Sequence, residues 1–396
     1  MVAVSVLAAG GGLIRMRVVL TANTSFYLWN FRRSTIEALL REGCQVLCLA
    51  PPDNYSPRLE SLGARFHAVK IERAGAGPAT ELALLYHLYR LLRRERPDAL
   101  FNFTIKMNLY CGLCARSLRI PYASNISGLG TAFIHDSWLY RQVRRVYGVA
   151  NRGATRVFFQ NPEDRDLFVS RGLAPPERTV LLPGSGVDTR RFAFSPLPDG
   201  IRDGHITFLM IARLIADKGV REYVEAARRV RAAWPTARFL LLGPGKVDNR
   251  SAISDAEIAA WQEEGIVEWQ GEQTDVLPFL QQCHVLVLPS YREGMPRTVL
   301  EAASVGRPAV VSDVPGCRHS VEADRTGWLC RARDAGSLAA VMMQVLEQAQ
   351  SDPQWLEAFG ERAAQRARRE FSEAIVVQAY LDALALMAPP GSVSRV

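Results

Sequence analysis

Short apolar runs alternate along the whole chain with amphipathic stretches of helical length. In the first half the apolar runs cover residues 17–21, 45–50, 99–103, 122–126, 156–160 and 179–182. In the second half they cover residues 206–211, 238–242, 267–270, 285–289 and 308–312. Strands that alternate with helices form parallel sheets with helices on both faces. The pattern therefore predicts an α/β fold with two Rossmann-like domains, one in each half.

The stretch from residue 190 to 205 separates the two halves, because it holds two prolines, two glycines and no clear periodicity. A chain of 396 residues is also long enough for two domains. We predict an N-terminal extension over 1–15, a first domain over 16–190 and a second over 191–372. The chain ends in two helical stretches, 353–370 and 373–387, and we expect the C-terminal segment 373–396 to pack back on the first domain.

The composition limits the class of protein. With 48% hydrophobic and 22% charged residues, the chain falls in the soluble globular range. No stretch approaches the roughly 20 apolar residues that a spanning helix needs. Seven widely scattered cysteines predict reduced thiols in the cytoplasm. The close pair Cys111 and Cys114 favours the packed side of a helix over a metal or redox site.

Charge is distributed unevenly between the halves. Residues 1–195 contain 26 Lys and Arg against 14 Asp and Glu, a net charge of +12, whereas residues 196–396 have a net charge of −4. A basic half next to a mildly acidic half indicates that the first domain meets an anionic partner, such as phosphates, nucleic acid or a membrane surface. The basic half contains no recognisable nucleic-acid motif, so we expect no nucleic acid partner.

Ligands of open α/β sheets bind beyond the carboxyl ends of the strands. One such loop runs from Ser290 to Glu301, after a buried apolar run. We expect a helix to begin there at Pro296, where a missing N–H costs nothing. The backbone N–H groups near Gly294 and Met295, with the positive end of the helix behind them, predict a phosphate site.

Two carboxylates flank this phosphate site, and they would repel the phosphate itself. Carboxylates accept hydrogen bonds from hydroxyls, so Glu293 suits a transferred sugar and Glu301 suits the ribose of a nucleotide. The alternative is an exposed helical ion pair between Arg297 and Glu301, with Glu293 only favouring the start of the helix.

A second loop, after residue 211, contains Arg213 and Lys218 at the carboxyl edge of the same predicted sheet. Two cations there can neutralise a diphosphate and stabilise the charge that develops when a sugar–diphosphate bond breaks. The alternative is that Lys218 pairs at the surface with Asp217 or Glu222. We take Glu293, Arg213 and Lys218 as the candidate catalytic residues.

Together these segments resemble the retaining family-four glycosyltransferases, which have the GT-B fold. The resemblance extends from about Met16 to Met387, and it is more specific toward a bacterial branch that extends undecaprenyl-diphosphate-linked sugars for surface polysaccharide or protein glycosylation. The segments that carry this narrower resemblance are residues 103–106, 125–131, 159–161, 182–188, 289–297 and 313–317. His319 departs from the pattern, because the family more often has a glutamate there.

The resemblance implies a cleft between the two domains, with the donor on the second domain and the acceptor on the first. It implies an α-linked product formed without a metal or other cofactor. Arg213 and Lys218 would hold the donor diphosphate, Glu293 with Gly294, Met295 and Pro296 the sugar, and Glu301 the ribose. We expect a UDP-sugar donor, an N-acetylhexosamine as the sugar, and a polyprenyl-diphosphate-linked saccharide as the acceptor.

The acceptor residues are predicted from the loops of the first domain. Lys106 suits a lipid diphosphate, with a solvated surface lysine as the alternative. Glycines and hydroxyls that suit a sugar, with a plain βα turn as the alternative, are found at Ser127, Gly128 and Thr131. Similar loop positions near the first strand are Asn23 and Thr24. His135 could act on the acceptor hydroxyl, but a structural role is the stronger alternative.

Two helical stretches of the basic half, 81–96 and 138–145, combine apolar spacing with cationic clusters. Such helices can lie on an anionic membrane surface, although an ordinary crossover helix is also amphipathic. We therefore expect a peripheral cytoplasmic protein on the inner face of the membrane. The Asp164 and Asp166 pair does not indicate a metal, because Asn161 and the following proline are typical of a helix start.

Other functions fit the residues less well. An epimerase acting on a UDP-sugar needs acid and base groups, for which only His135 and His319 are available. A glycosidase needs two carboxylates facing each other across the scissile bond, but Glu293 and Glu301 lie on one loop and helix. The alternatives are therefore a UDP-sugar epimerase on the same architecture and a transferase that uses a soluble acceptor.

Overall fold

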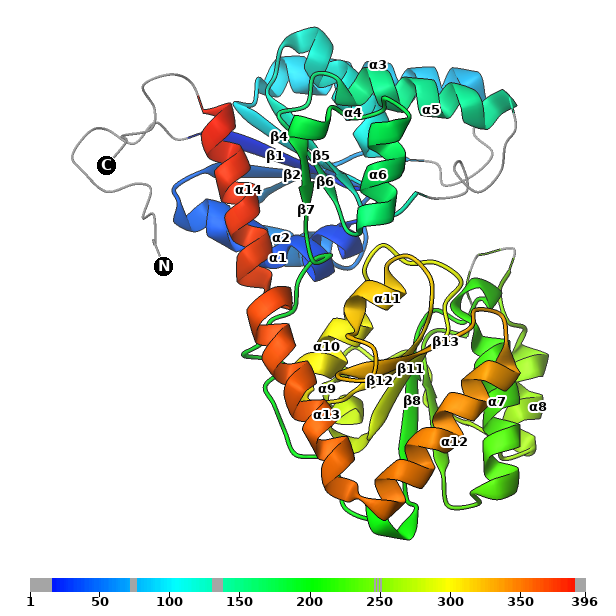
Figure 1. Ribbon diagram of the computed structural model, residues 1–396. Helices are drawn as coiled ribbons and strands as arrows, with labels where there is room; N and C mark the ends of the chain where they lie inside the picture. Colours follow the sequence, from blue (N-terminus) through cyan, green and yellow to red (C-terminus); the bar gives the residue numbers. More distant parts are fainter. Residues whose placement is uncertain are drawn as a thin grey trace. The chain divides into compact units, whose positions relative to one another are not determined.

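The computed structural model describes residues 16–71, 77–129, 138–245, 247, 249 and 251–388, without the side chains of 138–142. The chain divides into two compact units (Figure 1). The first unit comprises Met1–Ser185 with Ala374–Val396, and the second comprises Gly186–Glu373.

The first unit is built on a seven-stranded sheet in the order β3-β2-β1-β4-β5-β6-β7, whose neighbouring strands are parallel. Its strands are β1 (Arg17–Thr21), β2 (Gln45–Ala50), β3 (Arg65–Ala68), β4 (Ala99–Phe103), β5 (Tyr122–Ile126), β6 (Arg156–Phe159) and β7 (Thr179–Leu181). Because the chain reverses its direction of winding at β1 and β4, the loops after these strands open at the carboxyl edge of the sheet.

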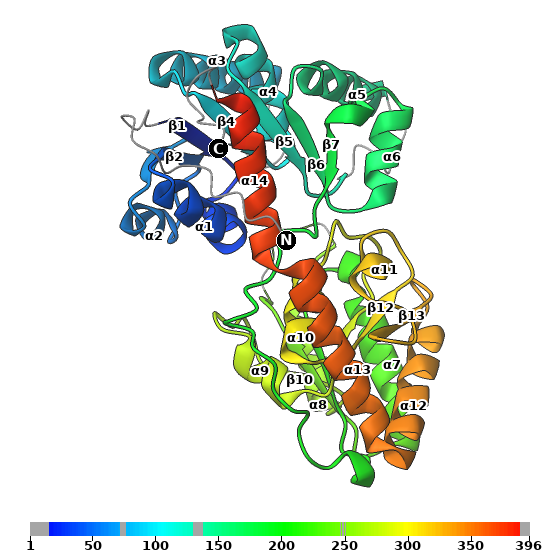
Figure 2. The ribbon, with the colours of Figure 1, turned by 60° about the vertical axis from the view of Figure 1, so that its left-hand side comes forward.

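Helices cover both faces of this sheet (Figure 2). They are α1 (Ser25–Arg41), α2 (Ser56–Ser61), α3 (Pro78–Glu95), α4 (Ile105–Leu118), α5 (Trp138–Asn151), α6 (Pro162–Ser170) and α14 (Glu373–Met387). Successive strand residues point to opposite faces, so Val19 joins a core with α3 and α4, whereas Leu20 joins a core with α1 and α14. The last helix therefore completes the core of the first unit through residues such as Tyr380.

The second unit has a six-stranded sheet in the order β10-β9-β8-β11-β12-β13, again with parallel neighbours. Its strands are β8 (Thr207–Ile211), β9 (Arg238–Leu242), β10 (Glu268–Trp269), β11 (Val285–Leu288), β12 (Ala309–Ser312) and β13 (Gly327–Cys330). Its helices are α7 (Val220–Ala233), α8 (Asp255–Glu263), α9 (Leu277–Gln282), α10 (Arg297–Val305), α11 (Cys317–Ser320), α12 (Ala335–Ser351) and α13 (Pro353–Arg366).

The stretch 190–205 is held within the second unit by the buried guanidinium of Arg307. This side chain donates to the carbonyl oxygens of Ser195 and Pro196 at 2.6 and 2.9 Å and to that of Leu280 at 2.9 Å. A buried arginine without a carboxylate partner is tolerated here because carbonyl oxygens accept its hydrogen bonds. The stretch is therefore anchored to this unit rather than loose between the two.

Each of the eleven predicted apolar runs contains a strand, with ends that differ by no more than one residue. Two strands lie outside the predicted runs, β3 and β13, and both are four-residue strands at a sheet edge. Strand β3 has no fully buried position and therefore no apolar run, whereas β13, with the sequence Gly-Trp-Leu-Cys, is largely buried and was missed in the sequence. The run predicted as a helix over 353–370 contains α13 followed by a short π-helical turn, Ala367–Phe371.

Candidate functional site

Two loops that lie far apart in the sequence meet at the carboxyl edge of the second sheet. The strands before them, β8 and β11, are neighbours, so their loops emerge side by side. The backbone N–H of Tyr291 donates to the carbonyl oxygen of Asp217 at 2.9 Å and ties one loop to the other. Gly219 has φ +75°, and a Cβ there would lie 2.2 Å from the carbonyl oxygen of Pro289. Only glycine fits this close approach.

The contact places two predicted residues together. Lys218 ends a 3-10 turn, Ala216–Lys218, and its ammonium forms an ion pair with the Glu293 carboxylate. Both side chains are largely buried, with 21% of Lys218 and 14% of Glu293 exposed, so the surrounding water screens the pair only in part. In this arrangement the cation and the carboxylate satisfy each other, and a ligand that brings an anion and hydroxyls can replace both halves of the pair.

One alternative partner of Lys218, Glu222, is engaged elsewhere. Glu222 accepts a hydrogen bond from the Tyr291 hydroxyl at 2.6 Å. Burial, together with this bond to Glu222, raises the pKa of Tyr291 to about 12. The guanidinium of Arg333 lies over the Tyr291 ring, 4.4 Å from its centroid. Tyr291 and Arg333 were not predicted as site residues, although Tyr291 lies within the predicted loop from Ser290 to Glu301, which was a usable signal.

Arg213 lies on the loop after β8 and is exposed. Its side chain has no hydrogen bond or ion pair with any residue of the described ranges. The neighbouring loop after β9 comes close to this loop because Gly243, with φ +148°, would place a Cβ 1.8 Å from the carbonyl oxygen of Ala212. The two cations predicted to hold a diphosphate thus differ: Lys218 is paired, and Arg213 is open to solvent.

The predicted phosphate loop at Gly294, Met295 and Pro296 precedes α10, a helix of nine residues. The helix begins at Arg297, and Pro296 is its N-cap, so the prediction of Pro296 as the first helical residue was wrong by one position. The reason is that Pro296 has ψ 109°, which is extended, and it contributes only its carbonyl oxygen to the first turn.

Gly316 packs against the backbone of this loop, and it was not predicted as a site residue. Its φ is +83°, and a Cβ there would lie 2.3 Å from the carbonyl oxygen of Glu293. The N–H of Glu293 donates to the carbonyl oxygen of Pro315 at 3.3 Å. These contacts fix the backbone of Glu293. The pair Pro315-Gly316, which is typical of a turn, was the signal available in the sequence for Gly316.

Glu301 lies in the second turn of α10 and is only 7% exposed. Its carboxylate accepts a hydrogen bond from Nε of Arg297 at 2.8 Å. Burial raises the pKa of Glu301, and the guanidinium of Arg297 opposes this shift. The ion pair foreseen as an alternative therefore exists, but it is buried rather than exposed, and the second carboxylate oxygen is left for another donor.

The predicted acceptor residues of the first unit come from adjacent strands, because β1, β4 and β5 are neighbours in the sheet. The residues concerned follow the ends of these strands: Asn23 and Thr24 after β1, Lys106 after β4, and Ser127 and Gly128 after β5. Asn23 is exposed, and Ser127 and Gly128 are partly exposed. Thr131 and His135 lie outside the described residues.

Two of these residues already have structural partners. The Thr24 hydroxyl accepts the backbone N–H of Tyr27 at 3.0 Å and caps α1. The Lys106 ammonium lies 2.7 Å from a carboxylate oxygen of Glu81, so it is not the solvated surface lysine that was considered as its alternative. Thr24 therefore has an ordinary capping role, whereas Lys106 holds a carboxylate at the edge where an acceptor is expected.

Two structural alternatives are confirmed. Cys111 and Cys114 are buried on the packed side of α4, and burial raises the pKa of Cys114 to about 12. Asn161 caps α6 by accepting the backbone N–H of Asp164 at 2.9 Å. Within the described ranges no group of three or more His, Cys, Asp or Glu side chains could hold a metal ion.

None of the helices that the structure describes is long and apolar enough to span a bilayer.

Comparison with known proteins gives two family matches. Residues 29–184 match the model described as a glycosyl transferase 4-like domain, and residues 205–348 match that of the glycosyl transferases group 1. One similar protein is the N,N'-diacetylbacillosaminyl-diphospho-undecaprenol alpha-1,3-N-acetylgalactosaminyltransferase of Campylobacter jejuni, 28% identical over 92% of this chain and 97% of that protein. Another is the UDP-Gal:alpha-D-GlcNAc-diphosphoundecaprenol alpha-1,3-galactosyltransferase of Escherichia coli, 25% identical over 67% of this chain and 71% of that protein.

A solved structure with a similar fold is Alr3699/HepE of Anabaena in complex with UDP and glucose. It has a TM-score of 0.76 and 17% sequence identity, and the match covers 94% of this chain and 100% of that one. The predicted architecture of two Rossmann-like domains in the GT-B fold is confirmed by this likeness and by the two parallel sheets.

Proposed function

Because the chain belongs to the group 1 and 4-like glycosyltransferases and is a sugar-transferring enzyme, we propose that it moves a sugar from a UDP-sugar to a saccharide linked to a polyprenyl diphosphate. The product is α-linked, as the names of the two relatives state for their own products. An N-acetylhexosamine is the first sugar to test, and galactose is the second.

The observation that carries the proposal is the ion pair between Lys218 and Glu293 at the carboxyl edge of the second sheet. A UDP-sugar offers a diphosphate to Lys218 and Arg213 and hydroxyls to Glu293. When the donor binds, Lys218 contacts the diphosphate instead of Glu293, and Glu293 accepts hydrogen bonds from the sugar hydroxyls instead of pairing with Lys218. Such an exchange leaves Lys218 paired with an anion and Glu293 hydrogen-bonded, so neither of the largely buried charges is left without a polar partner.

The chemical step requires stabilisation of the departing diphosphate. When the bond between the anomeric carbon and the phosphate oxygen breaks, negative charge develops on that oxygen. Lys218 and the start of α10 provide positive charge in fixed positions, and the exposed Arg213 adds a second cation beside them. We propose that these groups suffice and that transfer needs no metal ion.

A second feature, the exposed face of helix α3, bears on where the enzyme meets its lipid-linked acceptor. Helix α3 buries Leu84, Leu88, Leu91 and Leu92 in the first unit, yet it exposes Leu82 by 65% and Tyr86 by 63%. Arginines 90, 93 and 94 on the same helix are also exposed. Exposed apolar side chains beside cations fit the surface of an anionic bilayer. We propose that the enzyme works at the inner face of the cytoplasmic membrane, bound peripherally through α3.

One assay tests the transfer. The purified protein is given a panel of labelled UDP-sugars and a polyprenyl-diphosphate-linked saccharide, with and without EDTA. We expect label in the lipid extract from one UDP-sugar, and the same yield in EDTA. No lipid-linked label from any donor would refute the proposed transfer, and loss of product in EDTA would refute only the metal independence.

Membrane contact has its own test. Vesicles with anionic lipid should sediment the wild-type protein, and neutral vesicles should not. Replacing Leu82 and Tyr86 together with serine should weaken sedimentation, because it removes the two most exposed apolar side chains of α3. Equal sedimentation of the two proteins would show that α3 is not the contact.

A further inference from the structure

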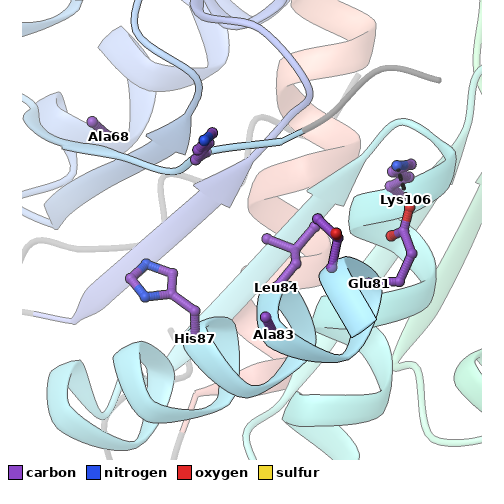
Figure 3. Close-up of a pocket in the computed structure, with 8 residues that line it drawn as sticks. Ala68, Glu81, Ala83, Leu84, His87 and Lys106 are labelled. Atoms are coloured by element: carbon purple, nitrogen blue, oxygen red, sulfur yellow. Dashed lines mark hydrogen bonds and ion pairs between the residues drawn. The ribbon is translucent and has the colours of Figure 1, made fainter. Parts of the chain in front are cut away.

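A pocket of about 370 Å³ lies on the first unit, between the first turns of α3, the end of β3 and the start of α4 (Figure 3). Its polar lining includes Lys70, Lys106, His87 and Glu81. Its apolar lining includes Ala68 and Leu84. The pocket therefore combines cationic groups with an apolar wall, and the end of β3 and the start of α4 belong to the same carboxyl edge as the predicted acceptor residues.

The choice of lysine at this pocket is unusual for this chain. The sequence has only four lysines beside 44 arginines, and Lys70 and Lys106 are the two lysines that belong to the first unit. Both line the pocket. A third, Lys218, is in the donor site. A lysine ammonium is a compact point charge with three donors, whereas a guanidinium is a wide planar fork. Three of the four lysines are therefore found at the two candidate anion sites.

The charges in the pocket are not balanced. Among the lining residues Glu81 is the one acid, and its carboxylate accepts hydrogen bonds from Lys106 at 2.7 Å and from the Tyr110 hydroxyl at 2.6 Å. Burial raises the pKa of Glu81, but these two bonds outweigh it and hold the pKa below its usual value. Lys70 forms no hydrogen bond or ion pair within the part of the chain that the structure describes. Glu81 therefore lies beside Lys106 where an anionic ligand would bind. Lys70 has no anionic partner among the described residues.

The surface next to the pocket is apolar. On the same turns of α3 that supply Glu81 and Leu84, Leu82 and Tyr86 are exposed by 65% and 63%. Large apolar side chains exposed next to a cationic pocket fit a ligand that has a charged head and an apolar tail.

We propose that this pocket holds the diphosphate of a prenyl-diphosphate-linked acceptor, with Lys70 and Lys106 on its phosphate oxygens and the prenyl chain over Leu82 and Tyr86. The proposal rests on the proposed function and specifies where its acceptor is gripped. When the diphosphate enters, Lys106 exchanges the Glu81 carboxylate for a phosphate oxygen, so Glu81 opposes binding. The pocket thus selects for the lipid carrier, whereas the sugar end of the acceptor is left to other loops.

The test is calorimetric titration of the full chain with farnesyl diphosphate, with the donor site saturated by UDP so that only the second anion site is measured. Lys70→Ala and Lys106→Ala should each weaken binding about tenfold. Glu81→Gln should tighten binding several-fold, because it removes the competing charge. Arg171→Ala, which removes an exposed cation elsewhere on the same unit, should leave binding unchanged. If these residues only stabilised the fold, the lysine replacements would not weaken binding while the Glu81 replacement tightens it.

A comparison of three ligands shows which part of the prenyl diphosphate the pocket binds. Farnesol should bind far more weakly than farnesyl diphosphate, and so should inorganic pyrophosphate. Pyrophosphate that binds as tightly as farnesyl diphosphate would overturn the lipid assignment. Wild-type protein that does not bind farnesyl diphosphate, or lysine variants that bind it as wild type does, would overturn the site.

The transfer assay separates this proposal from the proposed function. If wild type transfers sugar to the lipid-linked acceptor and both lysine variants keep its KM for the acceptor, the pocket is wrong and the function stands. If farnesyl diphosphate binds and depends on both lysines, but wild type labels no lipid-linked acceptor, the pocket stands and the function fails.

Discussion

Lys218 and Glu293 are 75 residues apart in the sequence, and their side chains form an ion pair between two loops of the second unit. The pair exists because β8 and β11 are neighbouring parallel strands, whose loops leave the sheet at the same edge. It joins the group expected to meet a diphosphate to the group expected to meet a sugar. The consequences of this arrangement can be measured separately for binding, folding and turnover.

Replacing Lys218 with alanine should weaken UDP binding by about tenfold or more, because a charge-assisted contact to the diphosphate is lost. The measurement is calorimetric titration with UDP. Arg229→Ala is a matched control, since it removes an exposed cation of α7 that pairs with Glu225. UDP binding that is unchanged in Lys218→Ala would place the diphosphate elsewhere.

Gly219→Ala should separate the two loops. The added Cβ would lie 2.2 Å from the carbonyl oxygen of Pro289, in a residue with φ +75°. We expect a loss of about 2 kcal/mol or more in the free energy of unfolding, together with weaker UDP binding. Gly265→Ala is the matched control, because Gly265 has φ +70° but nothing within 4 Å of the added Cβ.

The control isolates the cost of the left-handed backbone, which is about 1 kcal/mol, from the cost of the collision. Urea unfolding of both variants gives the comparison. If the two variants lose equal stability and both keep UDP affinity, then the contact of Gly219 with Pro289 does not hold the site together.

His284 makes the stability of the second unit depend on pH. It is buried, it accepts the backbone N–H of Thr207 at 3.0 Å, and burial lowers its pKa from 6.5 to about 4. The unfolded chain binds a proton near pH 6.5 and the folded chain does not. The resulting stability is therefore complete above pH 6.5 and is lost as the pH falls toward 4, by up to about 3 kcal/mol.

Urea unfolding at several pH values, followed by tryptophan fluorescence, measures this effect, since five of the seven tryptophans belong to the second unit. His284→Gln has no titrating imidazole and should show a shallower loss between pH 6.5 and 5. The same slope in both proteins would assign the pH dependence to other groups.

Much of this fold could be predicted because buried parallel strands are continuous apolar runs, such as Val285–Leu288. Strand β3, with the sequence Arg-Phe-His-Ala, could not be predicted, because an edge strand mixes exposed and partly buried positions. The start of α10 at Arg297 instead of Pro296 depends on a ψ angle that residue type does not fix. Local chemistry therefore predicts the elements better than their ends.

That the two loops of the second sheet lie at one edge could be predicted, but the pairing of their side chains could not. The sequence places Asp217 and Glu222 closest to Lys218, yet the ammonium pairs with Glu293 because the backbone bond from Tyr291 to Asp217 brings the loops together. The capping of α1 by the Thr24 hydroxyl was likewise not predicted, and the acceptor role of Thr24 stays a prediction. Contacts between loops depend on the assembled sheet, and no local pattern contains them.

Comparing turnover with UDP affinity in Glu293→Ala separates the role of Glu293 from that of Lys218. If Glu293 meets the transferred sugar and Lys218 meets the diphosphate, turnover should fall by about a hundredfold or more. UDP should bind at least as tightly as to wild type, because Lys218 no longer has a competing carboxylate. Turnover and UDP affinity that fall by the same factor would contradict this division of roles.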